Sequence, residues 1–215
     1  ERGAATSDEP VSPTMMTGLT PREALSGTKF WILGIALLFV CFGVAGLISN
    51  MVPLLIDKGF PAKEAAGYAG LVGINVIIGR IVVGYLIDRI WAPLISFIFM
   101  ILPAASCLLL APDQPAALGI SIAALLVGLA AGAELDLMAF LISRYFGMKN
   151  YGQLYGGLFI FFAVGSGSAP ALFGLWHDFA GSYQTILYVT AAMFVFGSSL
   201  LLLMGPYPEF EEQPA

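Results

Sequence analysis

The chain alternates between long apolar runs and short polar segments. Six runs each reach the roughly 20 residues that a helix needs to cross the hydrocarbon core of a bilayer. Because these runs are continuously apolar, without the alternation of barrel strands, they predict helices. We therefore expect an all-α polytopic membrane protein whose six transmembrane helices cover Phe30 to Ile56, Ala65 to Ile87, Pro93 to Ala111, Ala116 to Ser143, Tyr151 to Trp176 and Ser182 to Met204.

The distribution of cations predicts the orientation of these helices. The connecting segments are short and rich in turn residues, so neighbouring helices should be antiparallel. Near the helix ends, one side collects Arg22, Lys29, Arg89, Arg144 and Lys149, whereas the other side has Lys58 and Lys63. Since the cytoplasmic side retains the positive loops, both termini should be cytoplasmic. The predicted domains are a polar cytoplasmic linker at 1–28, a six-helix transmembrane domain at 29–205 and a cytoplasmic tail at 206–215.

Composition narrows the possible functions. Hydrophobic residues make up 59% of the chain and charged residues 11%, against roughly 45–50% and about 25% in soluble domains. The net charge of -5 comes mostly from the polar ends, and no basic patch indicates nucleic acid as a partner. Cys41 and Cys107 lie inside apolar runs, as small buried hydrophobic residues do. No metal-ligand spacing, phosphate loop or nucleophile elbow is present, so we expect neither an enzyme nor a cofactor.

Small residues within the spans predict helix contacts. Glycine recurs at short spacing in three of the runs, and such residues let helix backbones approach closely in lipid. The predicted contact glycines are Gly67, Gly70, Gly73, Gly128, Gly132, Gly152 and Gly156. Pro170 lies near the middle of the fifth run, where it should act either as a packing kink or as a hinge that lines a cavity.

Charged groups inside the hydrocarbon are candidates for function because burying them is costly. The spans hold Arg80, Glu134 and Asp136. Arg80 can bind an anionic substrate, extend to the inner interface, or form a permanent ion pair with Glu134 or Asp136. The two carboxylates are two positions apart, hence about 200° apart around the helix axis, and cannot face one cavity together. Either can pair statically or couple to a proton or substrate, and these alternatives remain open.

Four further polar groups lie in the spans or at their ends. Asn75 is deep in the second run, and Ser49 and Asn50 are near the end of the first. Each can bind a ligand or a neighbouring helix. His177 stands at the outer end of the fifth run, where a capping or surface role is expected.

The end of the second run carries a recognisable motif. The segment Gly79 to Arg89 reads G-R-x-x-x-G-x-x-x-D-R and resembles the loop motif of the major facilitator superfamily. The segment Gly132 to Gly147, followed by Tyr151 to Gly156, is similar to the corresponding part of members related to oxalate:formate antiporters and monocarboxylate transporters. The resemblance extends from Lys29 to Met204 and matches the carboxyl-terminal half of such a transporter.

The resemblance implies a fold and a mechanism. In that family each half consists of two three-helix units of inverted topology, and the substrate binds between the halves. Arg80 would meet a substrate carboxylate. Asn75, as a polar side chain deep in the same run, is the second candidate for the substrate site. The gate loop would comprise Gly84, Asp88, Arg89 and Arg144. A missing N-terminal six-helix half would be the partner, and a bacterial inner membrane the location.

Two departures from the family bear on the substrate. Oxalate carriers add a lysine in the fifth helix of this half, and none lies between Gly152 and Trp176, so a monoanion is favoured. Monocarboxylate carriers place an aspartate four residues before the arginine, where this chain has Val76. Proton coupling through that pair is therefore not expected.

The sequence supports three hypotheses. The first is secondary active transport of a small organic anion, with a proton or counter-anion as the coupled ion. The second is export of drugs or other apolar compounds through a cavity lined by aromatic side chains. The third is a truncated, non-transporting membrane protein. The chain begins with Glu1 and its first residues do not form a signal peptide, so we expect a segment to precede it.

Overall fold

The computed structural model describes residues 17–210, and within this range the chain forms seven helices and no strand. Six helices are long and apolar enough to cross a membrane. All six predicted helices and the all-α fold class are confirmed. The elements are α1 (Pro21–Ser26), α2 (Thr28–Asp57), α3 (Ala62–Ile87), α4 (Ala92–Leu110), α5 (Ala117–Phe146), α6 (Tyr151–Ala180) and α7 (Gln184–Leu202).

The six long helices divide into two units, α2 to α4 and α5 to α7. The first helices of the units, α2 and α5, each have 30 residues, and the last, α4 and α7, each have 19. The most extensive packing joins α3 to α5 and α2 to α6. These two pairs are equivalent, because α2 corresponds to α5, and α3 corresponds to α6, in the other unit. Because three crossings are an odd number, the second unit is inverted relative to the first.

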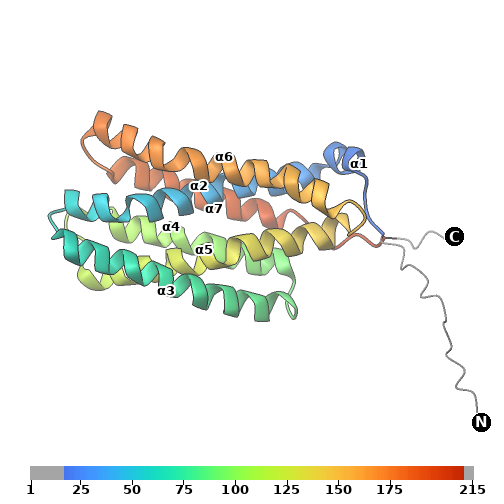
Figure 1. Ribbon diagram of the computed structural model, residues 1–215, viewed down its shortest axis with the longest axis horizontal. Helices are drawn as coiled ribbons and strands as arrows, with labels where there is room; N and C mark the ends of the chain where they lie inside the picture. Colours follow the sequence, from blue (N-terminus) through green and yellow to red (C-terminus); the bar gives the residue numbers. More distant parts are fainter. Residues whose placement is uncertain (1–16, 211–215) are drawn as a thin grey trace, which may run out of the picture.

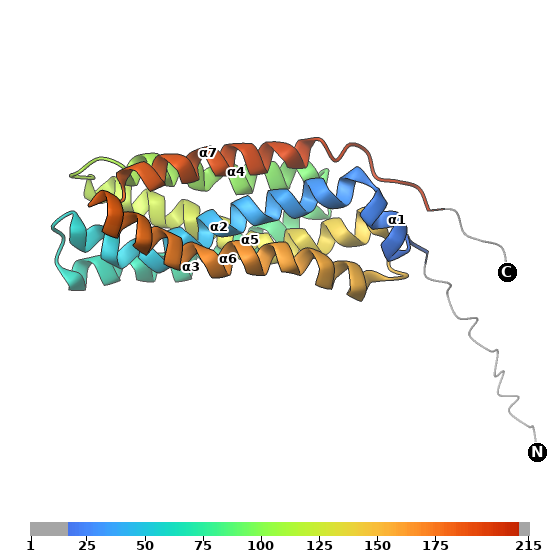
Figure 2. The same ribbon diagram turned by 90° about the horizontal axis from the view of Figure 1, so that it is seen from above.

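The bundle has three layers of helices. Seen from above, α4 and α7 lie on one side, α2 and α5 in the middle, and α3 and α6 on the opposite side (Figure 2). In the view of Figure 1, α3 and α6 lie at the two outer edges. Only 22% of the apolar window of each of these two helices is buried, against 61% for α2. Both helices therefore have broad apolar surfaces that are not covered by other described residues of this chain.

The segment before α2 packs against the loop that joins the two units. The backbone N–H of Leu19 donates to the carbonyl of Phe146 at 2.8 Å, and the Asn150 side chain donates to the carbonyl of Leu19 at 3.0 Å. Helix α1 begins at a capping box, in which the Thr20 backbone N–H donates to the Glu23 carboxylate at 2.8 Å. These bonds from Thr20 lower the pKa of Glu23. The segment predicted to be a linker thus contains a capped helix, while its residues 1–16 lie outside the described range.

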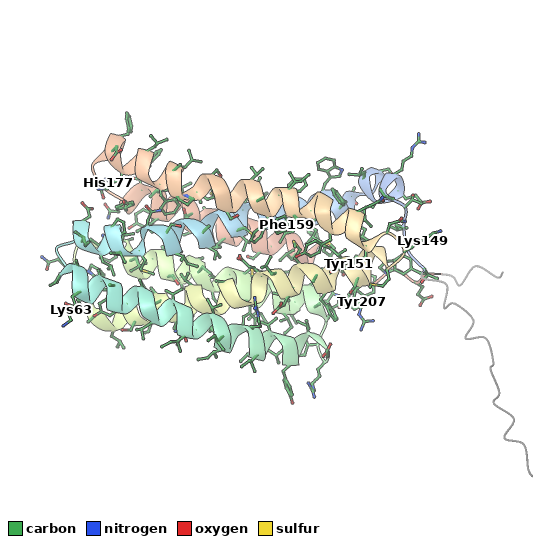
Figure 3. The ribbon with its side chains drawn as sticks, in the orientation of Figure 1. Lys63, Lys149, Tyr151, Phe159, His177 and Tyr207 are labelled. Atoms are coloured by element: carbon green, nitrogen blue, oxygen red, sulfur yellow. The ribbon has the colours of Figure 1, made fainter. Side chains whose placement is uncertain are left out.

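The segment after α7 covers the same end of the bundle. The Tyr207 hydroxyl accepts a hydrogen bond from the backbone N–H of Ala92 at 2.9 Å, and the Tyr145 hydroxyl donates to the carbonyl of Gly205. Lys29 donates to the carbonyl of Pro206 at 3.3 Å. Tyr207 and Lys149 lie at this end, opposite Lys63 and His177 (Figure 3). The described part of the predicted tail therefore packs against the bundle, and residues 211–215 lie outside the described range.

The opposite end is held by contacts between loops and helix ends. Lys58 donates to the carbonyl of Pro112 at 2.7 Å, and partial burial lowers the pKa of Lys58. His177 Nε2 lies 3.2 Å from Asp57 Oδ1, and the His177 ring stacks on Tyr183 with centroids 4.4 Å apart. His177 therefore links the end of α6 to the end of α2. This position agrees with the expectation that it lies at the outer end of its helix.

Glycines allow α3 and α5 to touch through their backbones. A Cβ atom at Gly132 would overlap the Val76 carbonyl oxygen, and one at Gly79 would overlap the Leu129 carbonyl oxygen. A Cβ atom at Gly128 would lie 2.6 Å from the Val72 carbonyl oxygen. The predicted contacts at Gly128 and Gly132 are confirmed.

The other predicted contact glycines behave differently. A Cβ atom at any of them would meet nothing within 4 Å. The prediction that they mediate helix contacts is wrong for contacts within the described chain, because these positions face outward on α3 and α6. They are Gly67, Gly70, Gly73, Gly152 and Gly156.

We expect Gly132→Ala to lower the free energy of unfolding by about 1–3 kcal/mol, because the added methyl group forces α3 and α5 apart. This loss should outweigh the better helix propensity of alanine. Reversible unfolding in mixed detergent micelles measures it. Gly70→Ala, which makes the same change where space is open, should leave stability unchanged or slightly higher; equal losses in both variants would contradict the packing account.

Candidate functional site

The contact between α3 and α5 places an arginine beside a carboxylate. Arg80 of α3 lies 3.2 Å from Asp136 of α5, measured between Nε and Oδ2. The backbone N–H of Arg80 is next to Gly132, so the two helices are in direct contact one turn from the pair. Of the partners left open by the sequence, the structure selects Asp136.

The ion pair is only partly shielded. The Arg80 side chain is 57% exposed and that of Asp136 is 37% exposed on the surface of the chain. The contact with Asp136 is made at Nε, and the two terminal nitrogens of the guanidinium group carry four further N–H donors. They form a planar fork whose spacing matches the two oxygens of a carboxylate. The pair therefore leaves a place where a second anion can bind.

Glu134 points to a different side of α5. Its position lies on the same face as Val127, Ala130 and Leu141, which are all buried in the core. Oε2 of Glu134 is fully enclosed and has no hydrogen-bond partner among the described residues. As the angular spacing predicts, the two carboxylates face different surroundings, and Glu134 takes no part in the pair with Arg80.

Asn75 does not join Arg80 in the described structure. Its side-chain amide donates to the carbonyl of Leu71, one turn earlier in α3, at 2.8 Å. Five positions separate Asn75 from Arg80, which places them about 140° apart around the helix. Asn50 similarly donates within its own helix, to Gly46 at 3.0 Å, and is buried. A shared site for Asn75 and Arg80 remains a proposal, for which this geometry offers no contact.

The residues of the resembling loop motif lie at the end where the terminal segments pack. Arg89 donates to the carbonyl of Tyr85 at 2.9 Å and stacks on that ring, 3.7 Å from its centre. Asp88 is the exposed C-cap of α3, and a Cβ atom at Gly84 would meet open space. Arg144 at the end of α5 lies over the Tyr207 ring at 5.9 Å. Asp88, Arg89 and Arg144 are thus exposed at this end of the bundle.

Two polar residues near Glu134 were missed by sequence reasoning. Cys41 of α2 adjoins the Glu134 carboxyl, and Ser96 of α4 lines the same cavity. The prediction that Cys41 and Cys107 are buried free thiols is confirmed. No local pattern links Cys41 to Glu134, because the two come from different helices and meet only in the folded bundle.

Comparisons with known proteins agree with this fold. No family model matches the chain. A protein of Thermoproteus tenax, named an uncharacterized 38 kDa protein in the 23S RNA operon, is 31% identical over 180 residues, covering 84% of this chain and 46% of that protein. Monocarboxylate transporter 12 of Xenopus laevis is 26% identical over 199 residues, covering 86% and 41%. The chain thus spans about half the length or less of these relatives.

A solved structure shows the same helix arrangement. The crystal structure of the E. coli fucose:proton symporter superposes with a TM-score of 0.71 at 18% identity, covering 87% of this chain and 46% of that one. At this identity the likeness establishes the fold alone. The curated relatives and this fold agree with the resemblance of the sequence to one six-helix half of a major facilitator superfamily transporter.

The ion pair can be tested by its energetic coupling. We expect Arg80→Gln and Asp136→Asn to be coupled by about 0.2–1 kcal/mol in the free energy of unfolding, the range of exposed pairs. A double-mutant cycle in mixed micelles measures this coupling. The matched control combines Arg89→Gln with Asp136→Asn, which should be additive because Arg89 binds Tyr85 instead. Additivity in both cycles would contradict the ion pair.

Proposed function

We propose that this chain is one half of a secondary transporter that moves a small organic anion, specifically a monocarboxylate, by alternating access. The observation that carries the proposal is the half-exposed guanidinium group of Arg80, which lies beside one carboxylate within a bundle of helices long and apolar enough to cross a membrane. Away from the helix ends, Arg80 is the one cation in the described spans. The name of the relative, monocarboxylate transporter 12, supports the same class of substrate.

The chemistry of the pair favours a monoanion. A carboxylate substrate would receive two parallel hydrogen bonds from the terminal nitrogens of Arg80. Asp136 already balances part of the arginine charge, so a second negative charge on the substrate would find no matching cation in this half. Aliphatic substituents would be accommodated by the apolar side chains of the surrounding helices.

Asp136 supplies a means of coupling the substrate to a proton. An ionised Asp136 competes with the substrate for Arg80 and repels its charge. Protonation of Asp136 removes both effects, so proton binding and anion binding favour one another, as symport requires. Asp136 of α5 would thus take the role of the aspartate that monocarboxylate carriers place four residues before the arginine, where this chain has Val76. Exchange for a counter-anion, in which Asp136 stays ionised, is the alternative coupling.

The substrate site is completed by the other half of the carrier. The exposed surfaces of α3 and α6 offer the area against which six further helices would pack. Alternating access would then expose Arg80 to each side of the membrane in turn. With both termini in the cytoplasm of a bacterial cell, Asp88, Arg89 and Arg144 would form the inner gate, since all three lie at the terminal end of the bundle.

Uptake measurements test the anion site. In proteoliposomes that contain this chain with the half that completes the carrier, Arg80→Ala should reduce uptake of labelled acetate by at least roughly 10- to 100-fold, since charged hydrogen bonds contribute about 1.5–3 kcal/mol each. Lys63→Ala, at the far end of α3, should leave uptake unchanged. Unchanged uptake with Arg80→Ala, or competition that follows lipophilicity instead of negative charge, would overturn the proposal.

The pH dependence separates the two coupling modes. If Asp136 carries the coupled proton, wild-type uptake should rise as the outside is acidified, because more carriers then hold a protonated Asp136. Asp136→Asn imitates the protonated form and should transport without this dependence. A full pH response in Asp136→Asn would rule out Asp136 as the coupled group and leave the anion site itself intact.

A further inference from the structure

The last ten residues of α6 are weakly held by the rest of the described chain. This outer segment, residues 171–180, lies at the end of the bundle opposite the terminal segments, where Figure 3 shows His177. One of its residues, Phe173, is buried. The Phe173 ring packs so closely on Gly46 of α2 that a Cβ atom there would overlap it. Few other contacts within this chain fix the position of the outer segment.

The helix is weakened directly before the outer segment. Pro170 has no backbone N–H, so the carbonyl of Ser166 lacks its helical partner, and the proline ring crowds that carbonyl. The Ser166 hydroxyl donates to the Phe162 carbonyl at 2.8 Å. The Ser168 hydroxyl donates likewise to the Val164 carbonyl at 2.7 Å. Such bonds to the preceding turn weaken and bend helices, so residues 166–170 have the properties of a hinge.

An indole group adds a cost to the observed position of the outer segment. Trp176 packs partly against the core, and its Nε1 atom is enclosed without a hydrogen-bond partner among the described residues. An enclosed donor without a partner is costly, because it has given up a hydrogen bond to water. Movement of the outer segment away from α2 would open this enclosure and relieve the cost.

His177 opposes this movement by linking the outer segment to two neighbours. Its Nε2 atom lies 3.2 Å from Asp57 Oδ1 at the end of α2. Its ring stacks on that of Tyr183, with centroids 4.4 Å apart, and Tyr183 is itself buried. On its other side, Nδ1 lies 3.8 Å from Asp178 Oδ1, but Asp178 belongs to the outer segment and adds no link. The contact with Asp57 therefore joins the ends of two helices.

The end of α2 is a firm anchor for this contact. Leu54 and Leu55, which directly precede the end of α2, are buried. Lys58 follows that end and donates to the carbonyl of Pro112, in the connection between α4 and α5, at 2.7 Å. His177 thus attaches a weakly held helix end to a firmly held one.

We propose that the outer segment of α6 is a gate that swings about the hinge at 166–170 and is latched in the closed position by His177 on Asp57. The exposed Pro170 then acts as a hinge, one of the two roles predicted for it. Because α6 lies in the layer against which the other half would pack, swinging of the outer segment changes the width of the passage between the halves at this end. The gate and its latch are both internal to this half.

Distances between two spin labels test the gate on the full chain in lipid bilayers, without any transport. One label is attached at Phe179→Cys, near the tip of the outer segment, and the other at Leu118→Cys, at the same end of the bundle in α5. Both positions are exposed, whereas the native Cys41 and Cys107 are buried away from the labelling reagent. Pulsed electron spin resonance should find one main distance, for the latched gate, and a minor second distance for the open one.

Breaking the latch should increase the open population. His177→Phe keeps an aromatic ring to stack on Tyr183 but removes the bond to Asp57, so the second distance should become roughly two- to tenfold more populated, the factor that one ordinary hydrogen bond represents. Asp57→Ala removes the other partner of the same bond and should have the same effect. Asp178→Asn is the matched control and should leave the distances unchanged.

Restoring the helix should cancel the effect of the broken latch. Pro170→Ala supplies the missing N–H, so the double variant with His177→Phe should return the second distance to its wild-type population. Unchanged distances in both His177→Phe and Asp57→Ala would overturn the latch. A second distance that stays equally populated after Pro170→Ala is added would overturn the hinge.

Discussion

The close contact between the backbones of α3 and α5 determines where the charged residues Arg80 and Asp136 lie. At Gly79, Gly128 and Gly132 the backbone of one helix occupies the space that a side chain would take. In lipid no hydrophobic force drives helices together, so van der Waals contact of this kind must hold them. Because α3 and α5 meet so closely, Arg80 reaches Asp136 directly instead of extending to the membrane interface.

This contact also separates the two carboxylates of α5. Asp136 lies on the flank that faces α3, and Glu134 lies on the face that packs against α2, α4 and α7. One helix therefore presents an acid to a partly exposed cation and another acid to the apolar core of the bundle. We interpret the first as part of the proposed anion site.

Much of the architecture could be predicted from the sequence, because a bilayer dictates the length and composition of each span. The limits of all six long helices were predicted within a few residues, and the G-R-x-x-x-G-x-x-x-D-R segment resembles the loop motif of the major facilitator superfamily. Helix α1 was missed although Thr20, Pro21 and Glu23 form a readable capping box. The sequence did not show which carboxylate pairs with Arg80. The angular spacing places Glu134 and Asp136 on different faces of the helix, but it does not tell which of these faces is buried in the core. For the same reason, spacing alone did not distinguish the contact glycine Gly132 from the outward-facing Gly70.

The contact between Arg80 and Asp136 can be observed directly in bilayers by a dipolar-coupling measurement in solid-state NMR. With ¹⁵N in arginine and ¹³C in the aspartate carboxyl group, the wild type should show a strong coupling between Arg80 Nε and the Asp136 carboxyl carbon, as the 3.2 Å separation of Nε and Oδ2 requires. The coupling should vanish when Gly132→Leu separates the helices. Absence of the coupling in the wild type, or its transfer to Glu134 on labelling of glutamate, would contradict the account.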